Sequence, residues 1–376
     1  MTNLKSMFSS LYPLFMLFLP AIHLGCAVDD SGKPCGTCGE GRICNLGLCM
    51  DVSIDLPRDA GPHDFDTEWW YYTGHLQKDN QRFGFEVTAF SYDINGTPAY
   101  MCHVGFTDQP AQAHYHTDGI TFEPARWSSS PLILEVMTCR IELSGDGHDH
   151  ITGRIPDGKE RDGNPGEWLI DLFVQPVKRP VFHGRGGIIQ MSDNGGNSWY
   201  YSYTRLSARG SITTPRTGKL DVQGIAWMDH QWGDFNVNQF KGWDWWSVQL
   251  DDDYELMLFK FRDWQNRPAG GAGTIILPKG DFIPIKDQDI HIKPLRTWKS
   301  THTDGIYPMD WDIDILDDSW HLEVRSVLDD QEMYNPAQNY WEGLVDITGV
   351  RDGCKIRGAG YTELSGYATD PLDPKP

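Results

Sequence analysis

The sequence has few basic residues for its length. Its 376 residues include 32 Lys and Arg against 53 Asp and Glu, which gives a formal net charge of -21. Binding to nucleic acid requires a basic surface that neutralises phosphate groups, and the chain contains no long run of Lys or Arg. We therefore expect no nucleic-acid partner. The length exceeds what one small domain needs and suits two domains of ordinary size.

Long hydrophobic runs are also missing, except for one near the N-terminus. Residues 11–22 are almost entirely apolar, a stretch too short to span a bilayer but typical of the core of a secretory signal peptide. The run leads to a Leu-Gly-Cys sequence that resembles the bacterial lipoprotein box, whose cysteine, here Cys26, is lipidated. We therefore expect a signal peptide over residues 1–25 and a lipid anchor on Cys26 that attaches the protein to a membrane. The expected location is the bacterial cell envelope, as an outer-membrane lipoprotein or otherwise as a periplasmic or secreted protein.

Cysteine is sparse outside one short segment. Half of the eight cysteines lie close together, at Cys35, Cys38, Cys44 and Cys49. In an oxidising compartment such a cluster is typical of two disulfides in a small module with almost no core, and the sequence leaves their connectivity open. A zinc site is the alternative, because Cys35 and Cys38 have the separation of metal ligands. We expect residues 26–58 to be a lipidated, Cys-rich spacer between the membrane and the body.

Three more cysteines lie further along the chain. Cys102 and Cys139 could form a disulfide within the body. This pairing would leave Cys354 as a free and buried thiol.

Helical periodicity is hard to find, and from residue 60 onward apolar and polar residues alternate instead. Every second residue is apolar in residues 82–89, 246–250, 257–261 and 311–315, which is the pattern of half-buried strands. Strands in this number must close into barrels or stack as sandwiches to bury one face and remove edges. The predicted fold class is therefore all-β and antiparallel.

A short pattern occurs twice and predicts an internal duplication. An acidic residue followed by two tryptophans begins at Glu68 and again at Asp244, and each copy precedes a polar turn and an alternating strand. The boundary between the copies is expected near residues 235–242. We therefore predict an N-terminal domain over residues 59–237 and a C-terminal domain over residues 238–376.

The common catalytic motifs are absent. The chain has no Gly-x-Ser-x-Gly elbow, no His-Glu-x-x-His, no phosphate-binding loop and no dinucleotide fingerprint. His148 and His150 follow a Gly-Asp-Gly sequence, so we interpret them as solvated histidines rather than metal ligands. Asp310, Asp312 and Asp314 alternate with apolar residues and are interpreted as the solvated face of a strand. We expect no metal and no cofactor.

Four segments embed polar residues among large aromatic ones. They are residues 64–75, 227–235, 242–246 and 340–343. Packing of a barrel end would explain the aromatic residues, but burial of ionisable groups is costly and is often accepted for function. An apolar cavity with one carboxylic acid of raised pKa can protonate an alkene, and aromatic faces then stabilise the carbocation.

Three of these segments and a motif near the C-terminus resemble the AttH-like family, which includes carotenoid hydratases and kievitone hydratase-like proteins. The motifs are Glu-Trp-Trp-Tyr-Tyr-Thr-Gly-His-Leu at 68–76, Asp-His-Gln-Trp-Gly at 229–233, Gly-Trp-Asp-Trp at 242–245 and Gly-Ala-Gly-Tyr-Thr-Glu-Leu-Ser-Gly-Tyr at 358–367. The resemblance implies two tandem lipocalin-like (calycin) antiparallel β-barrel domains. It also implies a hydrophobic small molecule, a lipid or terpenoid, as the partner.

The resemblance also suggests catalytic residues. Carotenoid hydratases are associated with a His-x-Trp pair and a Tyr-x-Asp pair whose Asp is the proton donor. His230 and Trp232 match the first pair, and Phe261 and Asp263 are the nearest counterpart of the second, with Phe in place of Tyr.

We therefore predict an enzyme that hydrates, isomerises or cyclises an apolar substrate by acid–base chemistry and is not a serine hydrolase. The predicted catalytic residues are His230, Asp263, Glu68 and Asp229, with Asp263 or Glu68 as the acid. The predicted substrate-binding residues are Trp69, Trp70, Tyr72, His75, Trp232, Trp243, Trp245, Phe261, Trp341 and Glu342. The alternative is a non-catalytic lipid-binding or surface-attachment lipoprotein, in which the aromatic motifs only shape a cavity.

Overall fold

The computed structural model describes most of the chain from residue 34 onward. The described residues are 34–369 except 95, 124, 130, 160–164, 192–195, 236–238, 317–318 and 336–337. The predicted signal peptide and the predicted lipidation site at Cys26 lie outside the described residues. Within the described part, no helix is both long and apolar enough to cross a membrane.

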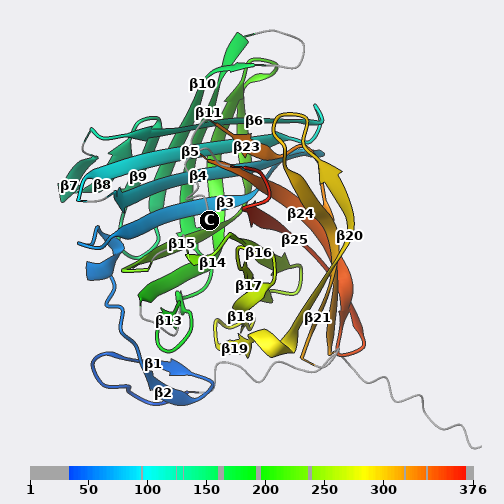
Figure 1. Ribbon diagram of the computed structural model, residues 1–376. Coiled ribbons are helices and arrows are strands. Elements are labelled where there is room, and N and C mark those ends of the chain that lie inside the picture. The colour runs from blue at the N-terminus through cyan, green and yellow to red at the C-terminus, as the bar shows by residue number, and fades with distance from the viewer. Residues whose placement is uncertain are drawn as a thin grey trace, which may run out of the picture.

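Two large antiparallel sheets form the body, the first coloured blue to green and the second yellow-green to red (Figure 1). The first sheet has the order β6-β5-β4-β3-β15-β14-β11-β10-β9-β8-β7, with β12 and β13 paired to β14. Its strands are β3 (Thr67–Lys78), β4 (Gln81–Asp93), β5 (Pro98–Asp108), β6 (Ala113–Thr121), β7 (Arg126–Ser129), β8 (Leu132–Val136), β9 (Cys139–Leu143), β10 (Asp149–Lys159), β11 (Pro165–Pro176), β12 (Val181–Phe182), β13 (Ile188–Gln190), β14 (Asn197–Thr214) and β15 (Gly218–Gly233).

The second sheet repeats this plan on a smaller scale. Its order is β19-β18-β17-β16-β25-β24-β22-β21-β20, with β23 paired to β24. Its strands are β16 (Gly242–Leu250), β17 (Glu255–Arg262), β18 (Pro268–Ile276), β19 (Phe282–Lys286), β20 (Ile290–Lys299), β21 (Ile306–Ile315), β22 (Trp320–Ser326), β23 (Glu332–Tyr334), β24 (Asn339–Arg351) and β25 (Cys354–Ser365).

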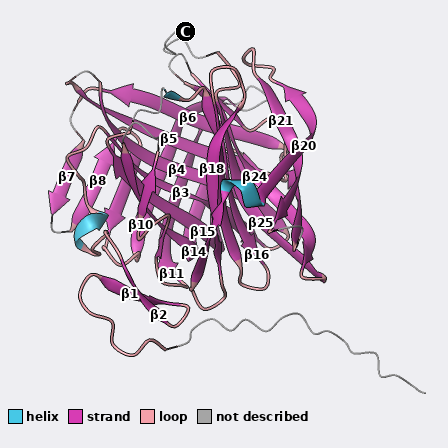
Figure 2. Cartoon of the chain, turned by 60° about the horizontal axis from the view of Figure 1, so that its bottom comes forward, coloured by secondary structure: helices cyan, strands magenta, loops and turns pink. Residues whose placement is uncertain are grey.

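Both sheets are curled, and the described chain is almost entirely strand (Figure 2), which confirms the all-β prediction. In each sheet the first long strand pairs with the last one, β3 with β15 and β16 with β25. The two acidic-Trp-Trp motifs lie on equivalent strands, β3 and β16, in agreement with the predicted duplication.

Neighbouring residues of the two acidic-Trp-Trp motifs lie in different hydrophobic clusters. Trp70 is packed in the core of the first sheet and Trp246 in the core of the second. Tyr71 and Trp245 belong to a third cluster, which joins residues of both sheets. Because successive side chains of a strand point to opposite faces, β3 and β16 each supply one domain core and the space between the sheets.

The Cys-rich segment forms the expected disulfide-bonded module. Cys35 is bonded to Cys44 and Cys38 to Cys49, around the two short strands β1 (Arg42–Asn45) and β2 (Leu48–Asp51). These bonds exclude the zinc alternative, which requires free thiolates.

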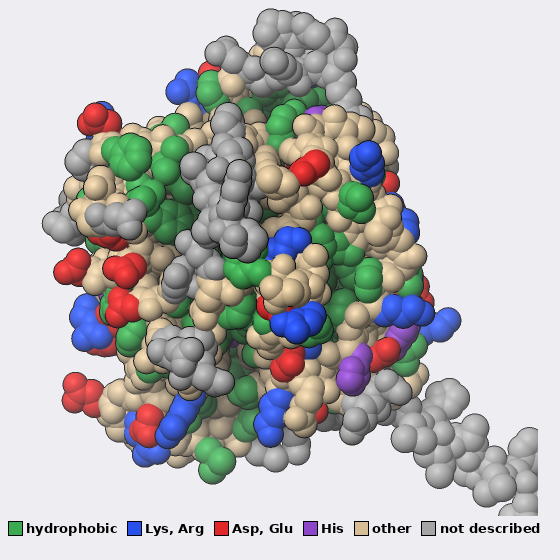
Figure 3. All heavy atoms as spheres, in the orientation of Figure 1, with side chains coloured by type: hydrophobic (Ala, Val, Ile, Leu, Met, Phe, Trp, Pro, Cys, Tyr) green, Lys and Arg blue, Asp and Glu red, His purple; other side chains and the backbone are tan. Residues whose placement is uncertain are grey.

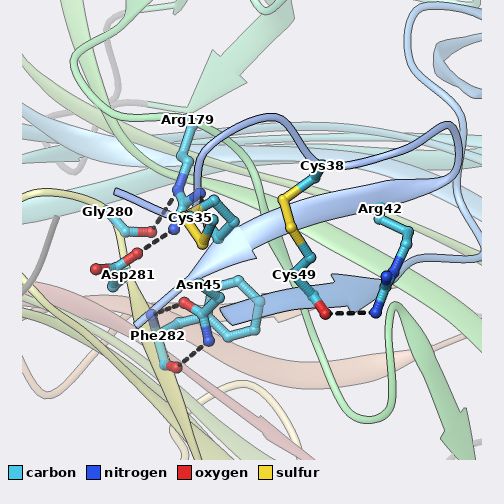
Figure 4. Close-up of a disulfide and its surroundings, with 10 residues drawn as sticks. Cys35, Cys38, Arg42, Asn45, Cys49, Arg179, Gly280, Asp281 and Phe282 are labelled. Carbon is cyan, nitrogen blue, oxygen red and sulfur yellow. Dashed lines mark hydrogen bonds and ion pairs between the residues drawn. A yellow bond between two sulfur atoms is a disulfide. The ribbon is translucent and has the colours of Figure 1, made fainter. Parts of the chain in front are cut away.

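The module is docked against the second sheet (Figure 4). The Asn45 amide donates to the Phe282 carbonyl at 3.0 Å and accepts from the Phe282 N–H at 2.8 Å. Arg179, in the loop after β11, donates to the Cys44 carbonyl and pairs with Asp281. Whether the module also spaces the body from a membrane stays a prediction.

The other cysteines partly follow the prediction. Cys102 and Cys139 form the expected disulfide, between β5 and β9. The prediction of a free Cys354 is wrong, because this residue is disulfide-bonded and the described part of the chain contains no free cysteine. Cys354 is half-buried at the start of β25 rather than enclosed in a core, so its sulfur is accessible to a partner.

The acidic surface agrees with the composition. On the face drawn in Figure 3, acidic and basic side chains are interspersed, and no continuous basic surface is visible. Asp310, Asp312 and Asp314 occupy the half-exposed face of β21, as predicted, and Arg296 and Arg325 pair with the first two of them.

Candidate functional site

A cavity of about 320 Å³ lies between the two sheets, lined by residues of both. Aromatic and aliphatic side chains form most of its wall. Four acidic residues interrupt this wall: Glu86 on β4, Asp229 on β15, Glu342 on β24 and Glu363 on β25. The one lysine among the described lining residues, Lys241, donates to the Asn266 side chain at 2.9 Å.

Asp229 is held by three donors. The Tyr200 hydroxyl donates to Oδ2 at 2.7 Å, and the Trp227 indole N–H donates to Oδ1 at 2.6 Å. The Ser202 hydroxyl also donates to Oδ1. Burial raises the pKa of Asp229 to about 7, although these hydrogen bonds counteract part of the shift. The group therefore exchanges a proton near neutral pH.

A buried histidine extends this network to the second sheet. His183 Nε2 lies 2.7 Å from Ser202 Oγ, and His183 Nδ1 lies 2.9 Å from Thr274 Oγ1 on β18. Burial lowers the pKa of His183 to about 3, so the ring is neutral. Since Ser202 gives its hydrogen to Asp229, His183 Nε2–H donates to Ser202, and the Thr274 hydroxyl donates to Nδ1.

Glu86 and Glu342 each have one carboxyl oxygen without a hydrogen-bond partner among the described residues. Burial raises the pKa of Glu342 well above its usual range, and the nearby Glu86 and Glu363 raise it further. Burial also raises the pKa of Glu86, to about 8. Tyr71 donates to Glu342 Oε1 at 2.6 Å, and Thr88 donates to Glu86 Oε1 at 2.8 Å. The Oε2 atom of each has no hydrogen-bond partner among the described residues.

Glu363 is the fourth acidic residue that lines the cavity, and all four carboxyl groups have raised pKa values. Burial raises the pKa of Glu363 to about 7, with the Trp243 indole counteracting part of the shift. Two of the four groups come from each sheet. Burial is the largest cause of the raised pKa of all four groups.

The structure brings six of the predicted site residues to the cavity. They are Asp229, Glu342, Trp69, Trp243, Trp245 and Phe261. In three of the four aromatic segments, 64–75, 227–235 and 340–343, neighbouring predicted residues occupy the opposite face of the strand. Trp70, Tyr72 and Trp232 are packed in the first core and Trp341 in the second.

His230 and Glu68 lie together, but on the side of β3 and β15 that faces the first core. His230 Nε2 is 2.8 Å from Glu68 Oε1, and His63 Nδ1 is 2.7 Å from the same oxygen. Burial would raise the pKa of Glu68, but its hydrogen bonds with His230 and His63 lower it overall. Burial lowers the pKa of His230. Glu68, a carboxylate from the first domain, is therefore the group that orients His230, whereas Asp229 faces the other way.

Asp263 and His75 lie away from both groups. Asp263 is in the turn between β17 and β18, where it accepts from the backbone N–H groups of Gln265 and Arg267 and pairs with the Arg267 side chain. It is not among the described residues that line the cavity. His75 is half-buried near the end of β3, seven positions after Glu68.

Sequence reasoning missed Glu86, Glu363 and the tyrosines that contact the acidic groups. Glu86 alternates with the apolar residues Phe85 and Val87, which suggested a solvated face, but the second sheet covers that face as well. Glu363 lies inside the C-terminal motif, where its position between Thr362 and Leu364 could have marked it as facing away from the second core.

The comparison with known proteins identifies the family. A family model described as AttH-like matches residues 50–367. The chain belongs to the AttH-like family. Among its relatives, kievitone hydratase of Fusarium solani subsp. phaseoli is 22% identical over 321 residues, which cover 81% of this chain and 89% of that protein.

Solved structures show the same AttH-like fold. The crystal structure of a protein described as an AttH from Nitrosomonas europaea is 25% identical, with a TM-score of 0.71, and the match covers 84% of this chain and 97% of that one. Kievitone hydratase from Nectria haematococca is 18% identical, with a TM-score of 0.66 and coverage of 85% and 94%. The predicted family and the pair of lipocalin-like half-barrels are therefore confirmed.

Proposed function

We propose that this AttH-like protein is an acid–base enzyme of the hydratase type, which acts on an uncharged apolar molecule in the cavity between the sheets. The observation that carries the proposal is the pair Glu86 and Glu342. Both side chains are buried and line an aromatic cavity, both have raised pKa values, and each has one oxygen without a described partner. Such groups can donate a proton at neutral pH.

We propose Glu342 as the acid. Its protonated carboxyl group donates the proton to one carbon of a carbon–carbon double bond, and the charge develops on the other carbon. The faces of Trp245 and Phe259 stabilise this cation. A water molecule then adds to the cation and gives one proton to a carboxylate, for which Asp229 is suited because its pKa is about 7. The net change is addition of one water, and the reverse sequence is dehydration.

The relatives support this chemistry in a general way. A kievitone hydratase is both a sequence relative and a structural neighbour, and its name states addition of water. The acid proposed here differs from the sequence-based choice, because Asp263 lies in a turn and Glu68 faces the first core. The proposal therefore rests on Glu342, Glu86 and Asp229.

The experiment is a pair of single substitutions assayed with uncharged alkenes, such as terpenoids and unsaturated lipids, in ¹⁸O-labelled water. Glu342→Gln keeps the size of the side chain and is expected to lower incorporation of ¹⁸O at least about 100-fold. Asp263→Asn separates the two assignments, because it abolishes turnover only if the turn residue is the acid. Glu167→Gln, at an exposed residue paired with Arg154, is the matched control. Full activity of Glu342→Gln would contradict the proposal.

The second candidate function is a carrier for an apolar molecule. The predominantly apolar wall of the cavity favours it, since a carrier needs few polar groups. Wild-type protein would then bind the same alkenes without converting them, and Glu342→Gln would bind them with unchanged affinity. Binding without any ¹⁸O incorporation across the panel would favour the carrier.

We propose further that the protein is exported. The disulfides of the module and of β5 and β9 support export, because an oxidising compartment maintains such bonds. We do not extend the proposal to a lipid anchor on Cys26, because Cys354 is disulfide-bonded and Cys26 is the one cysteine of the sequence outside the three other pairs, and one sulfur cannot carry both a disulfide and a lipid. Cell fractionation is expected to recover the protein outside the cytoplasm. Recovery in the cytoplasmic fraction would contradict export.

A further inference from the structure

We propose that His63, Glu68 and His230 form a binding site for one divalent transition-metal ion, for which Zn²⁺ is the best fit. The three side chains already converge. Glu68 Oε1 lies 2.7 Å from His63 Nδ1 and 2.8 Å from His230 Nε2, and the three potential ligand atoms lie within 4.8 Å of one another. Two imidazoles and one carboxylate are a common ligand set for zinc, with a fourth position left for water.

The backbone holds two of the ligands in place. In the pairing of β3 with β15, Glu68 is opposite Trp232 and His230 is opposite Trp70. Glu68 and His230 are therefore diagonal neighbours on one face of the sheet, at a separation set by strand geometry. A site built on adjacent strands needs little reorganisation to bind an ion.

The third ligand comes from the segment before β3 and is oriented by two contacts. The ring of His63 stacks on Trp232 with 3.9 Å between centroids and 5° between planes. The His63 backbone N–H donates to Glu68 Oε2 at 2.9 Å. This bond engages the second carboxylate oxygen and leaves Oε1 as the single ligand atom of Glu68.

The other nitrogen of each imidazole faces an oxygen. His230 Nδ1 lies 3.4 Å from the Tyr201 hydroxyl, and His63 Nε2 lies 3.7 Å from Asp59 Oδ1. Histidines that bind a metal usually direct their second ring nitrogen to such an oxygen, which fixes the tautomer and the ring orientation. Tyr201 and Asp59 can serve this purpose here.

The ion would replace two hydrogen bonds. Ligand atoms around tetrahedral zinc are about 3.4 Å apart, so His63 and His230 must each move from Oε1 by about half an ångström. His63 can move, because it lies outside the strands and its side chain is 17% exposed, against 1% for Glu68 and 0% for His230. The same exposure gives the ion its route from solvent.

This site is independent of the cavity and of the proposed function. It lies on the face of β3 and β15 that packs against the first core, whereas Asp229 faces the space between the sheets. The sequence showed no metal motif, because the ligands come from positions 63, 68 and 230. The bound ion would fasten the segment before β3 to the sheet.

The test uses the full chain, freed of metal with a chelator and kept without reductant so that the module disulfides stay closed. Zn²⁺ alone is titrated by calorimetry, and Co²⁺ is titrated with visible absorption as the readout of coordination. We expect one equivalent of each ion, d–d absorption bands for Co²⁺ and a higher melting temperature with Zn²⁺. His63→Ala is expected to weaken Zn²⁺ binding at least about tenfold.

The matched control is His148→Ala, which removes an exposed histidine that has its own acidic partner, Asp146, at 3.0 Å. It is expected to bind Zn²⁺ as wild type does. His230→Gln is the second variant. If it does not fold, the result for His63→Ala decides the test, because His63 is partly exposed and outside the strands. Wild-type protein without stoichiometric binding, or His63→Ala with wild-type affinity, would overturn the proposal. So would a His63→Ala variant whose melting temperature drops equally with and without Zn²⁺, because the cluster would then be only a hydrogen-bonded clamp.

Discussion

Buried carboxyl groups on the two sides of the paired strands β3 and β15 have pKa values shifted in opposite directions. On the cavity side, Asp229 has only neutral donors, and burial raises its pKa to about 7. On the opposite side, Glu68 lies between two imidazoles, and its pKa is lowered although it is as deeply buried. Burial alone therefore does not decide whether a carboxyl group keeps its proton. The hydrogen-bond partners decide it: two imidazoles contact Glu68, whereas the described partners of Asp229 are two hydroxyl groups and an indole.

A third buried carboxyl group has cationic partners, and its pKa is nevertheless raised. Glu255 is fully buried between the sheets, where Lys178 Nζ lies 2.7 Å from Oε2 and the Arg205 guanidinium contacts Oε1. Burial raises the pKa of Glu255, and these two cations counteract part of the shift. No cation among the described residues pairs with the four cavity acids, which favours a role in chemistry rather than in cohesion for them.

The largest expected effect that tests this comparison comes from His230→Ala. The substitution removes one of the two imidazole contacts of Glu68 Oε1 and the contact of the Tyr201 hydroxyl with His230 inside the first core. A buried polar group left unsatisfied costs about 1–3 kcal/mol. We expect a clearly lower melting temperature, with turnover reduced only in proportion to the folded fraction. Chemical denaturation and the ¹⁸O assay on the same samples measure both.

The corresponding change on the cavity side is Asp229→Asn. It is expected to give the reverse pattern, with a small change in stability and a large loss of turnover. If His230→Ala instead removes turnover at an unchanged melting temperature, the catalytic centre is on the His230 side and the comparison fails.

A smaller effect is expected in the pH dependence of stability. Glu86, Asp229 and Glu363 have pKa values of about 8, 7 and 7 in the folded protein, above the values of unfolded chains. The folded state therefore binds more protons than the unfolded state between about pH 5 and 8, so the free energy of unfolding falls as the pH rises through this window. The lowered pKa of Glu68 has the opposite sign, since its contribution is lost only when the pH falls through the folded value.

Denaturant unfolding of the wild type and of Glu86→Gln at several pH values measures this difference. Removal of one titrating group is expected to reduce the slope of the free energy of unfolding against pH by up to about 1.4 kcal/mol per pH unit. Glu167→Gln again serves as the control, because its carboxylate is exposed. Identical slopes for wild type and Glu86→Gln would show that Glu86 is ionised in the folded protein.

Much of the fold follows from residue patterns, but the faces of the strands do not. Alternation in residues 82–89 predicts β4, and the repeated acidic-Trp-Trp motif predicts equivalent strands in the two sheets. Alternation also shows that Trp69 and Trp70 must point in opposite directions. It does not show which of them faces the other sheet, because that depends on how the two sheets pack.

The candidate site shows the same division. Asp229 and Glu342 are recognisable as ionisable residues among aromatic ones, and both line the cavity. Asp263 lies in a turn, where it contacts Arg267. These contacts are specific to this hairpin, and the alternation of apolar and polar residues does not predict them. Glu86 has the opposite problem, since a glutamate on an alternating strand normally indicates solvent.

The four acidic residues of the cavity come from both sheets, and this has a consequence for the synthesis of the protein. A ribosome completes β4 and β15 first, and in that nascent chain Glu86 and Asp229 have no second sheet to shield them from water. The burial that raises their pKa values is then incomplete. Glu363 belongs to β25, the last strand of the chain, and this strand also pairs with β16 to complete the second sheet. The acidity proposed for catalysis is thus among the last properties that the growing chain acquires, and no amino-terminal fragment that stops before β25 can possess it in full.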